Sequence, residues 1–184
     1  MSEKKNCFKE FILPILVLVL ICIVVGSAMA AINLITAPKI AEDHKIKEEA
    51  ALSAVVPDNQ GFTQVSIDDL PESITGFYTD NGSAAIAVML SVKGYDSSNP
   101  MSVAVGFDEN GEIIKCSVIS CNGETKGIGS KIADEGFLSR FYGKTDVSSV
   151  DTISGATISS RAFKDALEDA CKVVSAFREA EVTK

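Results

Sequence analysis

The chain has 184 residues, 46% of them hydrophobic, and a formal net charge of −8 at pH 7. This length allows one membrane segment and one ordinary domain with a sizeable core. Only three of the 17 Lys and Arg residues and two of the 25 Asp and Glu residues precede Lys39, so the remainder is strongly acidic. An acidic surface repels phosphate backbones, which excludes nucleic acid as an expected partner.

The N-terminal part of the sequence is too apolar for a soluble core. Residues 11–36 contain no charged side chain, and as a helix they extend roughly 39 Å, more than the ~30 Å hydrocarbon layer of a bilayer. We predict a transmembrane helix over 11–36, preceded by a cytoplasmic N-terminus over 1–10. A cleaved signal peptide is the alternative, because Ala28 and Ala30 form an A-x-A-like site, but the apolar run is about twice the usual length.

The charges around this segment favour one orientation only weakly. Three lysines lie close to each end: Lys4, Lys5 and Lys9 before it, and Lys39, Lys45 and Lys47 after it. The free N-terminal amine tips the balance toward a cytoplasmic N-terminus. We therefore expect a single-pass protein of the cell membrane whose domain lies outside the cytoplasm.

Residues 37–57, rich in Ala, Glu and Lys, predict a juxtamembrane helix that ends at Pro57. Two pairs of β-rich runs follow, 74–79 with 84–92 and 101–107 with 112–120, and each pair flanks a turn that contains Asn-Gly. Such pairs are typical of β-hairpins, so we expect a mainly antiparallel sheet.

The rest of the chain predicts a glycine-rich loop over 121–130, a short broken helix over 131–144 and a strand over 147–153. From Ser159 to Arg178, apolar residues recur every three or four positions, as in an amphipathic helix, with Ser159 and Ser160 as plausible caps. The expected fold class is α+β, with residues 58–184 forming a domain in which helices flank the sheet.

Several kinds of active site are disfavoured by the sequence. The one histidine, His44, lies among charged residues of the juxtamembrane helix, so neither a nucleophilic triad nor a zinc site is expected. The five cysteines contain no CxxC pair, and we expect the three in the domain to be buried free thiols rather than metal ligands: Cys116, Cys121 and Cys171.

Thr157 lies among small residues just before the last predicted helix. The first amides of a helix have no intrahelical partner and carry a partial positive charge, so a phosphate joined to this hydroxyl would be stabilised there. The alternative is that Thr157 caps the helix, which is the commoner role of such a threonine. The local sequence alone leaves both interpretations open.

Longer motifs favour the phosphate. Asp151-x-x-Ser154-Gly155-Ala156-Thr157 resembles the D-x-x-[ST]-G-A-T attachment motif of covalent flavoproteins, and Gly94-Tyr95 followed by the run 124–129, ETKGIG, resembles a GY…ETPGLG signature of the same family. Lys126 stands where proline is common. The chain thus resembles, over nearly its full length, the covalent FMN-binding family of the G subunit of the Rnf electron-transport complex, with the C subunit of the sodium-translocating NADH:quinone oxidoreductase as the near alternative.

This resemblance implies FMN joined to Thr157 through its phosphate by a flavin transferase. It implies that the transferase recognises Asp151 and three residues that also belong to the cofactor site: Ser154, Gly155 and Ala156. It also implies that four further residues approach the isoalloxazine ring: Glu124, Thr125, Gly127 and Ile128. The implied function is an electron carrier in a ferredoxin:NAD oxidoreductase that moves Na+ or H+, in which this chain is one redox subunit rather than an enzyme on its own and the other Rnf subunits are its partners. The alternative from a different class is a membrane-anchored, flavin-free binding module.

Overall fold

The computed structural model describes residues 12–67 and 69–182, so the expected cytoplasmic segment 1–10 lies outside the described residues. The chain divides into two compact units, Met1–Ile46 and Lys47–Lys184.

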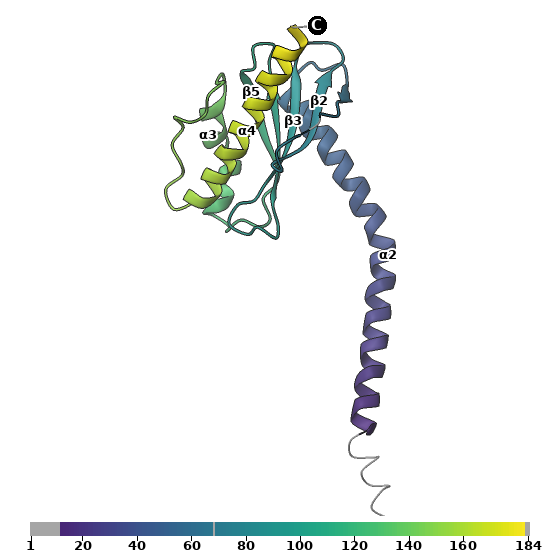
Figure 1. Ribbon diagram of the computed structural model, residues 1–184. Helices are drawn as coiled ribbons and strands as arrows, with labels where there is room; N and C mark the ends of the chain where they lie inside the picture. The colour runs from purple at the N-terminus through teal and green to yellow at the C-terminus, as the bar shows by residue number, and fades with distance from the viewer. Residues whose placement is uncertain (1–11, 68, 183–184) are drawn as a thin grey trace, which may run out of the picture. The chain divides into compact units, whose positions relative to one another are not determined.

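A single helix, α2 (Leu13–Val55), covers most of the residues in which we expected a membrane helix and a juxtamembrane helix (Figure 1). It continues through Pro38. Its large apolar side chains from Leu13 to Ile35 are exposed, as expected for a helix surrounded by lipid. Within the described part of the chain, α2 alone is long and apolar enough to cross a membrane, with a mean hydropathy of 3.0 in its most apolar window.

The second unit is built on a five-stranded antiparallel sheet in which each strand pairs with the next along the chain. The strands are β1 (Phe62–Gln64), β2 (Ile74–Asp80), β3 (Ile86–Val92), β4 (Met101–Phe107) and β5 (Ile113–Ser120). Both predicted hairpins, β2–β3 and β4–β5, are confirmed. Strand β1 was not predicted, since three residues are too few to show an alternating pattern.

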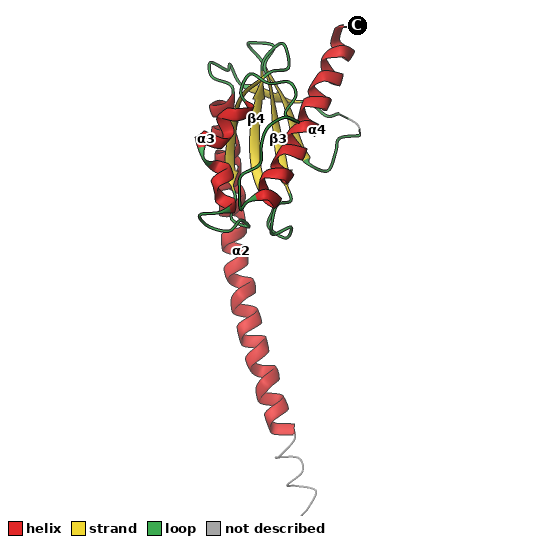
Figure 2. Ribbon diagram, turned by 90° about the vertical axis from the view of Figure 1, so that its left-hand side faces the viewer, coloured by secondary structure: helices red, strands yellow, loops and turns green. Residues whose placement is uncertain are grey.

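Large apolar side chains of the sheet point to the face covered by α4 (Thr157–Val182), which crosses the strands in Figure 2. Successive side chains of a strand face opposite sides, so large residues of β3 and β4 alternate with small ones. The large set packs against the apolar stripe of α4: Ile86, Val88, Leu90, Met101, Val103, Val105 and Phe107 against Phe163, Ala166, Leu167, Ala170 and Val174.

The opposite face is lined mostly by alanines, with Met89 as the large exception, and is covered by the last turns of α2, which belong to the second unit. Ala87, Met89 and Ala104 form a buried cluster there with Leu52 and Val55. Near them, Gly106 lies so close to the carbonyl of Val55 that a Cβ would overlap it. The end of α2 is therefore part of the core of the domain.

The expected broken helix over 131–144 is present as three short pieces: η2 (Gly129–Ala133), α3 (Glu135–Leu138) and η3 (Ser139–Phe141). Their aromatic side chains meet α4, because Phe137 and Phe141 lie 5.7 and 5.5 Å from Phe163 between ring centroids. Aromatic pairs at this spacing add to the stability gained by burial. They hold the first half of α4 in place.

The prediction of a strand over 147–153 was wrong. Val147 and Val150 are buried, but the backbone between them turns, since the Ser148 amide donates to Asp146 and the Val150 amide donates to the Val147 carbonyl. Two buried valines three residues apart are compatible with a turn as well as with a strand. The apolar pattern was therefore satisfied without any strand pairing.

Candidate functional site

The helix α4 begins at Thr157, two residues earlier than predicted. The predicted caps Ser159 and Ser160 are buried inside the first turn, and the residue just before the helix is Ala156, whose side chain cannot accept a hydrogen bond. Gly155 has φ +83°, a conformation that side chains disfavour and glycine adopts freely. The S-G-A-T sequence thus brings the chain sharply into the helix and leaves the Thr157 side chain exposed.

The first turn of α4 is not capped from within the described residues. In this part of the chain no hydrogen bond is made by the Thr157 hydroxyl or by the amides of Thr157, Ile158 and Ser159. The nearby Ser160 hydroxyl turns inward and donates to the Ala156 carbonyl at 2.7 Å. Uncapped amides at the positive end of a 26-residue helix favour an anion. The interpretation of Thr157 as a simple helix cap is therefore wrong.

A cavity of about 380 Å³ opens at this helix start. Three segments far apart in the sequence form its walls: the connection after β3, the loop after β5, and the start of α4. The lining residues are Tyr95, Thr125, Ile128, Gly129, Gly155, Ala156, Thr157, Ile158 and Ser159. Its size falls within the range of small-molecule and cofactor sites.

Exposed apolar side chains of the domain gather at this cavity. Among the described residues after α2, the large apolar side chains left exposed are Tyr95, Ile128 and Ile158, at 67%, 48% and 60%, and all three line it. Single exposed apolar residues are ordinary, but a cluster of them marks a binding site. The cavity thus offers apolar surface for a ring beside free amides for an anion, which fits the two halves of FMN.

Glu124 lies behind the cavity wall rather than in the lining. Its side chain is buried, and its carboxylate accepts a hydrogen bond from the Tyr95 amide at 2.9 Å and another from the Ser159 hydroxyl. The three cavity walls therefore meet at one carboxylate.

Five of the eight cofactor-site residues expected from the sequence line the cavity: Thr125, Ile128, Gly155, Ala156 and Thr157. The other three, Glu124, Gly127 and Ser154, and the transferase-recognition residue Asp151 lie outside its lining. The sequence reasoning missed four lining residues: Tyr95, Gly129, Ile158 and Ser159. Tyr95 and Gly129 belong to the two signature motifs, so the motifs could have predicted both as residues of the site.

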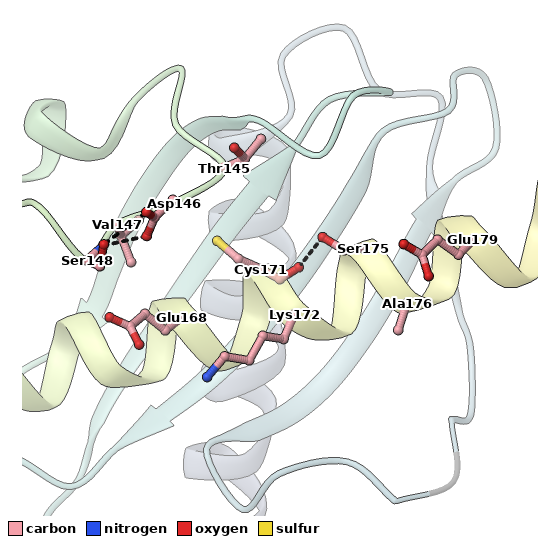
Figure 3. Close-up of a pocket in the computed structure, with 10 residues that line it drawn as sticks. All are labelled: Thr145, Asp146, Val147, Ser148, Glu168, Cys171, Lys172, Ser175, Ala176 and Glu179. Atoms are coloured by element: carbon pink, nitrogen blue, oxygen red, sulfur yellow. Dashed lines mark hydrogen bonds between the residues drawn. The ribbon is translucent and has the colours of Figure 1, made fainter.

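A second cavity, of about 410 Å³, lies along the later turns of α4 and is drawn in Figure 3. Its polar groups are partly paired among themselves: the Ser148 hydroxyl donates to Asp146, and the Ser175 hydroxyl donates to the Cys171 carbonyl. The lining side chains are small or charged, with no large apolar or aromatic residue. Of the two cavities, the one at Thr157 is better suited to a flavin.

The buried cysteines are poor nucleophiles. Cys116 and Cys171 are buried free thiols as expected, whereas Cys121 is half-buried. Burial, followed by the neighbouring Asp146 carboxylate, raises the pKa of the Cys171 thiol to about 11, and burial raises the pKa of Cys116 further. Among the described residues no group of three His, Cys, Asp or Glu side chains could hold a metal ion.

These pKa shifts predict slow alkylation of Cys116 and Cys171 in the folded protein. At about pH 8, a thiol with a pKa near 11 is ionised in only about one molecule in a thousand. Iodoacetamide should modify both residues far more slowly in the native chain than in urea, as peptide mapping would show. Equal rates for Cys171 in the two states would contradict this account of the core.

Comparison with known proteins agrees with the motifs. Residues 94–172 match the model of the FMN-binding domain family, a range that starts at Gly94 and includes every residue of the Thr157 cavity. Over 173 residues, 87% of this chain and 89% of the relative, the chain is 25% identical to the G subunit of the proton-translocating ferredoxin:NAD(+) oxidoreductase complex of Clostridium ljungdahlii. Residues 94–172 are therefore similar to FMN-binding domains, and most of the chain is similar to the G subunit of an Rnf-type complex.

Proposed function

We propose that this chain is the FMN-carrying electron-transfer subunit of a membrane-bound ferredoxin:NAD oxidoreductase of the Rnf type, which couples electron transfer to Na+ or H+ movement. The cavity at Thr157 carries the proposal, because uncapped amides and the exposed apolar side chains of the domain meet there. The similarity to an Rnf-type G subunit, which extends over most of the chain, favours this assignment over the C subunit of a quinone reductase.

Each wall of the cavity has a distinct part in this proposal. The Thr157 oxygen would hold FMN through a phosphate ester formed by a flavin transferase that reads Asp151 and the S-G-A-T residues. The free amides of Ile158 and Ser159 would bind phosphate oxygens, and the apolar side chains of Tyr95 and Ile128 would exclude water. Bound flavin supplies the one- and two-electron chemistry.

The anchor fits the same function. We propose that α2 crosses the membrane once and that the domain lies outside the cytoplasm, where a lost cofactor could not be replaced and a covalent ester prevents dissociation. The weak excess of positive charge at the N-terminus supports this orientation. The other subunits of the complex would then supply the ferredoxin and NAD sites.

The function is tested in membrane vesicles from cells that lack this chain. Reduced ferredoxin should no longer drive NAD reduction, and the full-length chain should restore it. The purified mature chain should be yellow, with an absorption band that bleaches on chemical reduction. A colourless chain from a host with an active flavin transferase would favour a flavin-free binding module.

Replacing Ile128 tests the apolar wall. Ile128→Ser removes apolar surface at the cavity rim, so water should reach the flavin more freely and the flavin fluorescence of the native protein should rise. Stability should change by less than about 0.5 kcal/mol, because the side chain is half-exposed. Steady-state fluorescence of the folded chain measures the first effect and urea unfolding the second.

Lys126→Ser is the matched control, since Lys126 is exposed in the same loop and does not line the cavity. Its native flavin fluorescence should equal that of the wild type. If Ile128→Ser also has the native flavin fluorescence of the wild type, the Ile128 side chain does not shield the flavin from water.

A further inference from the structure

The buried carboxylate of Glu124 joins segments that are distant in sequence. It lies in the loop after β5, and its side-chain oxygens bind Tyr95, 29 residues earlier, and Ser159, 35 residues later. Tyr95 and Ser159 line the Thr157 cavity but Glu124 does not. A carboxylate in this position fixes the distance between the cavity walls without touching what the cavity contains.

The surroundings leave room for this carboxylate and for little else. A Cβ on Gly129 would lie 2.5 Å from Glu124 Oε2, and a Cβ on Gly94 would overlap Oε1. Both glycines thus provide space for Glu124. The signature motifs Gly94-Tyr95 and 124–129 therefore share one structural purpose, which is to surround this side chain.

The carboxylate is buried without a cation. Within 12–67 and 69–182, the ion pairs are Lys93–Glu72 and Lys172–Asp169, and neither involves Glu124. Its two oxygens both accept hydrogen bonds, one from an amide and the other from a hydroxyl. Charge-assisted hydrogen bonds of this kind are roughly twice as strong as neutral ones.

We propose that Glu124 is a positioning residue for the flavin site: its carboxylate holds Tyr95 and Ser159 on two of the three walls, and its unpaired negative charge opposes the addition of electrons to the ring. This inference rests on the proposed function. It assigns Glu124 a place behind the wall rather than a contact with the cofactor. The Glu124 side chain is 5% exposed, and the electrostatic interactions of a buried charge are little screened by solvent and salt.

Two substitutions separate the geometric effect from the charge. In Glu124→Gln, the amide oxygen still accepts from Tyr95 and the NH2 group can donate to the Ser159 oxygen, so the walls remain joined while the charge is lost. Glu124→Ala loses both hydrogen bonds. Glu168→Gln, at the second cavity, removes one negative charge away from the site and serves as the control.

The experiment uses the full-length chain matured with a flavin transferase. Glu124→Gln should raise the flavin midpoint potential and keep the flavin circular dichroism of the wild type. Glu124→Ala should also lose much of that circular dichroism and lower the fluorescence anisotropy of the attached flavin. Glu168→Gln should match the wild type in all three measurements.

The results distinguish failure of the inference from failure of the function. If the wild type carries flavin but Glu124→Gln has an unchanged potential and Glu124→Ala an unchanged flavin spectrum, Glu124 is structural only and the inference is overturned. If Glu124→Ala does not fold, an unchanged potential in Glu124→Gln alone overturns it. A wild-type chain without flavin overturns the proposed function and the inference together.

Discussion

Thr157→Ala should abolish covalent flavin. A denaturing gel of the wild-type chain, matured with a flavin transferase, should show a fluorescent band at the size of the chain, and the variant should show none. The reason is chemical, since alanine has no oxygen through which the phosphate could be joined. The fold should be retained, because the Thr157 side chain is exposed and makes no hydrogen bond within the described part of the chain.

Two further variants make this result specific. Thr157→Ser keeps an oxygen at the start of α4 and should retain part of the fluorescence. Thr152→Ala removes a neighbouring hydroxyl at a variable position of the attachment motif, and its fluorescence should equal that of the wild type. A band that stays fluorescent in Thr157→Ala would refute attachment at this residue.

Leu52→Ala should strongly destabilise the domain, although Leu52 belongs to the helix that contains the membrane segment. Its side chain is 5% exposed and packs beneath the sheet with Val55 and Ala104. Removing a buried leucine side chain costs about 2–5 kcal/mol, a large part of the ~5–15 kcal/mol that stabilises a typical domain.

Urea unfolding of the full-length chain in detergent measures this effect. The chain has no tryptophan and three tyrosines, of which Tyr78 packs against the same cluster, so tyrosine fluorescence reports on the region. Ser53→Ala, the next residue but exposed, should unfold at the wild-type urea concentration. Equal midpoints for Leu52→Ala and Ser53→Ala would show that the end of α2 does not stabilise the domain.

The sheet was largely predictable because its signals are local. Asn-Gly turns lie between β-rich runs, and the side chains that alternate along β3 and β4 pack on opposite faces, one against α4 and the other against the end of α2. The failed strand at 147–153 shows the limit of this reasoning. Val147 and Val150 are buried by packing against the core, and burial alone does not distinguish a strand from a turn.

The site was predictable only in part. A contiguous motif pointed to Thr157, and this residue lines the cavity. The helix begins two residues earlier than predicted, which explains why this threonine is exposed rather than capping. The cavity walls depend instead on contacts across 29 and 35 residues. No local sequence pattern indicates that Glu124 contacts Tyr95 and Ser159, because these contacts form only in the tertiary fold.

The central claim is that Thr157 carries FMN through a phosphate ester. Mass spectrometry of the tryptic peptide 145–161, taken from the natively matured chain, tests it most directly. The account predicts a peptide heavier by one FMN less one water, with fragments that place the addition on Thr157. An unmodified peptide, or an addition on Ser154 or Thr152, would contradict it.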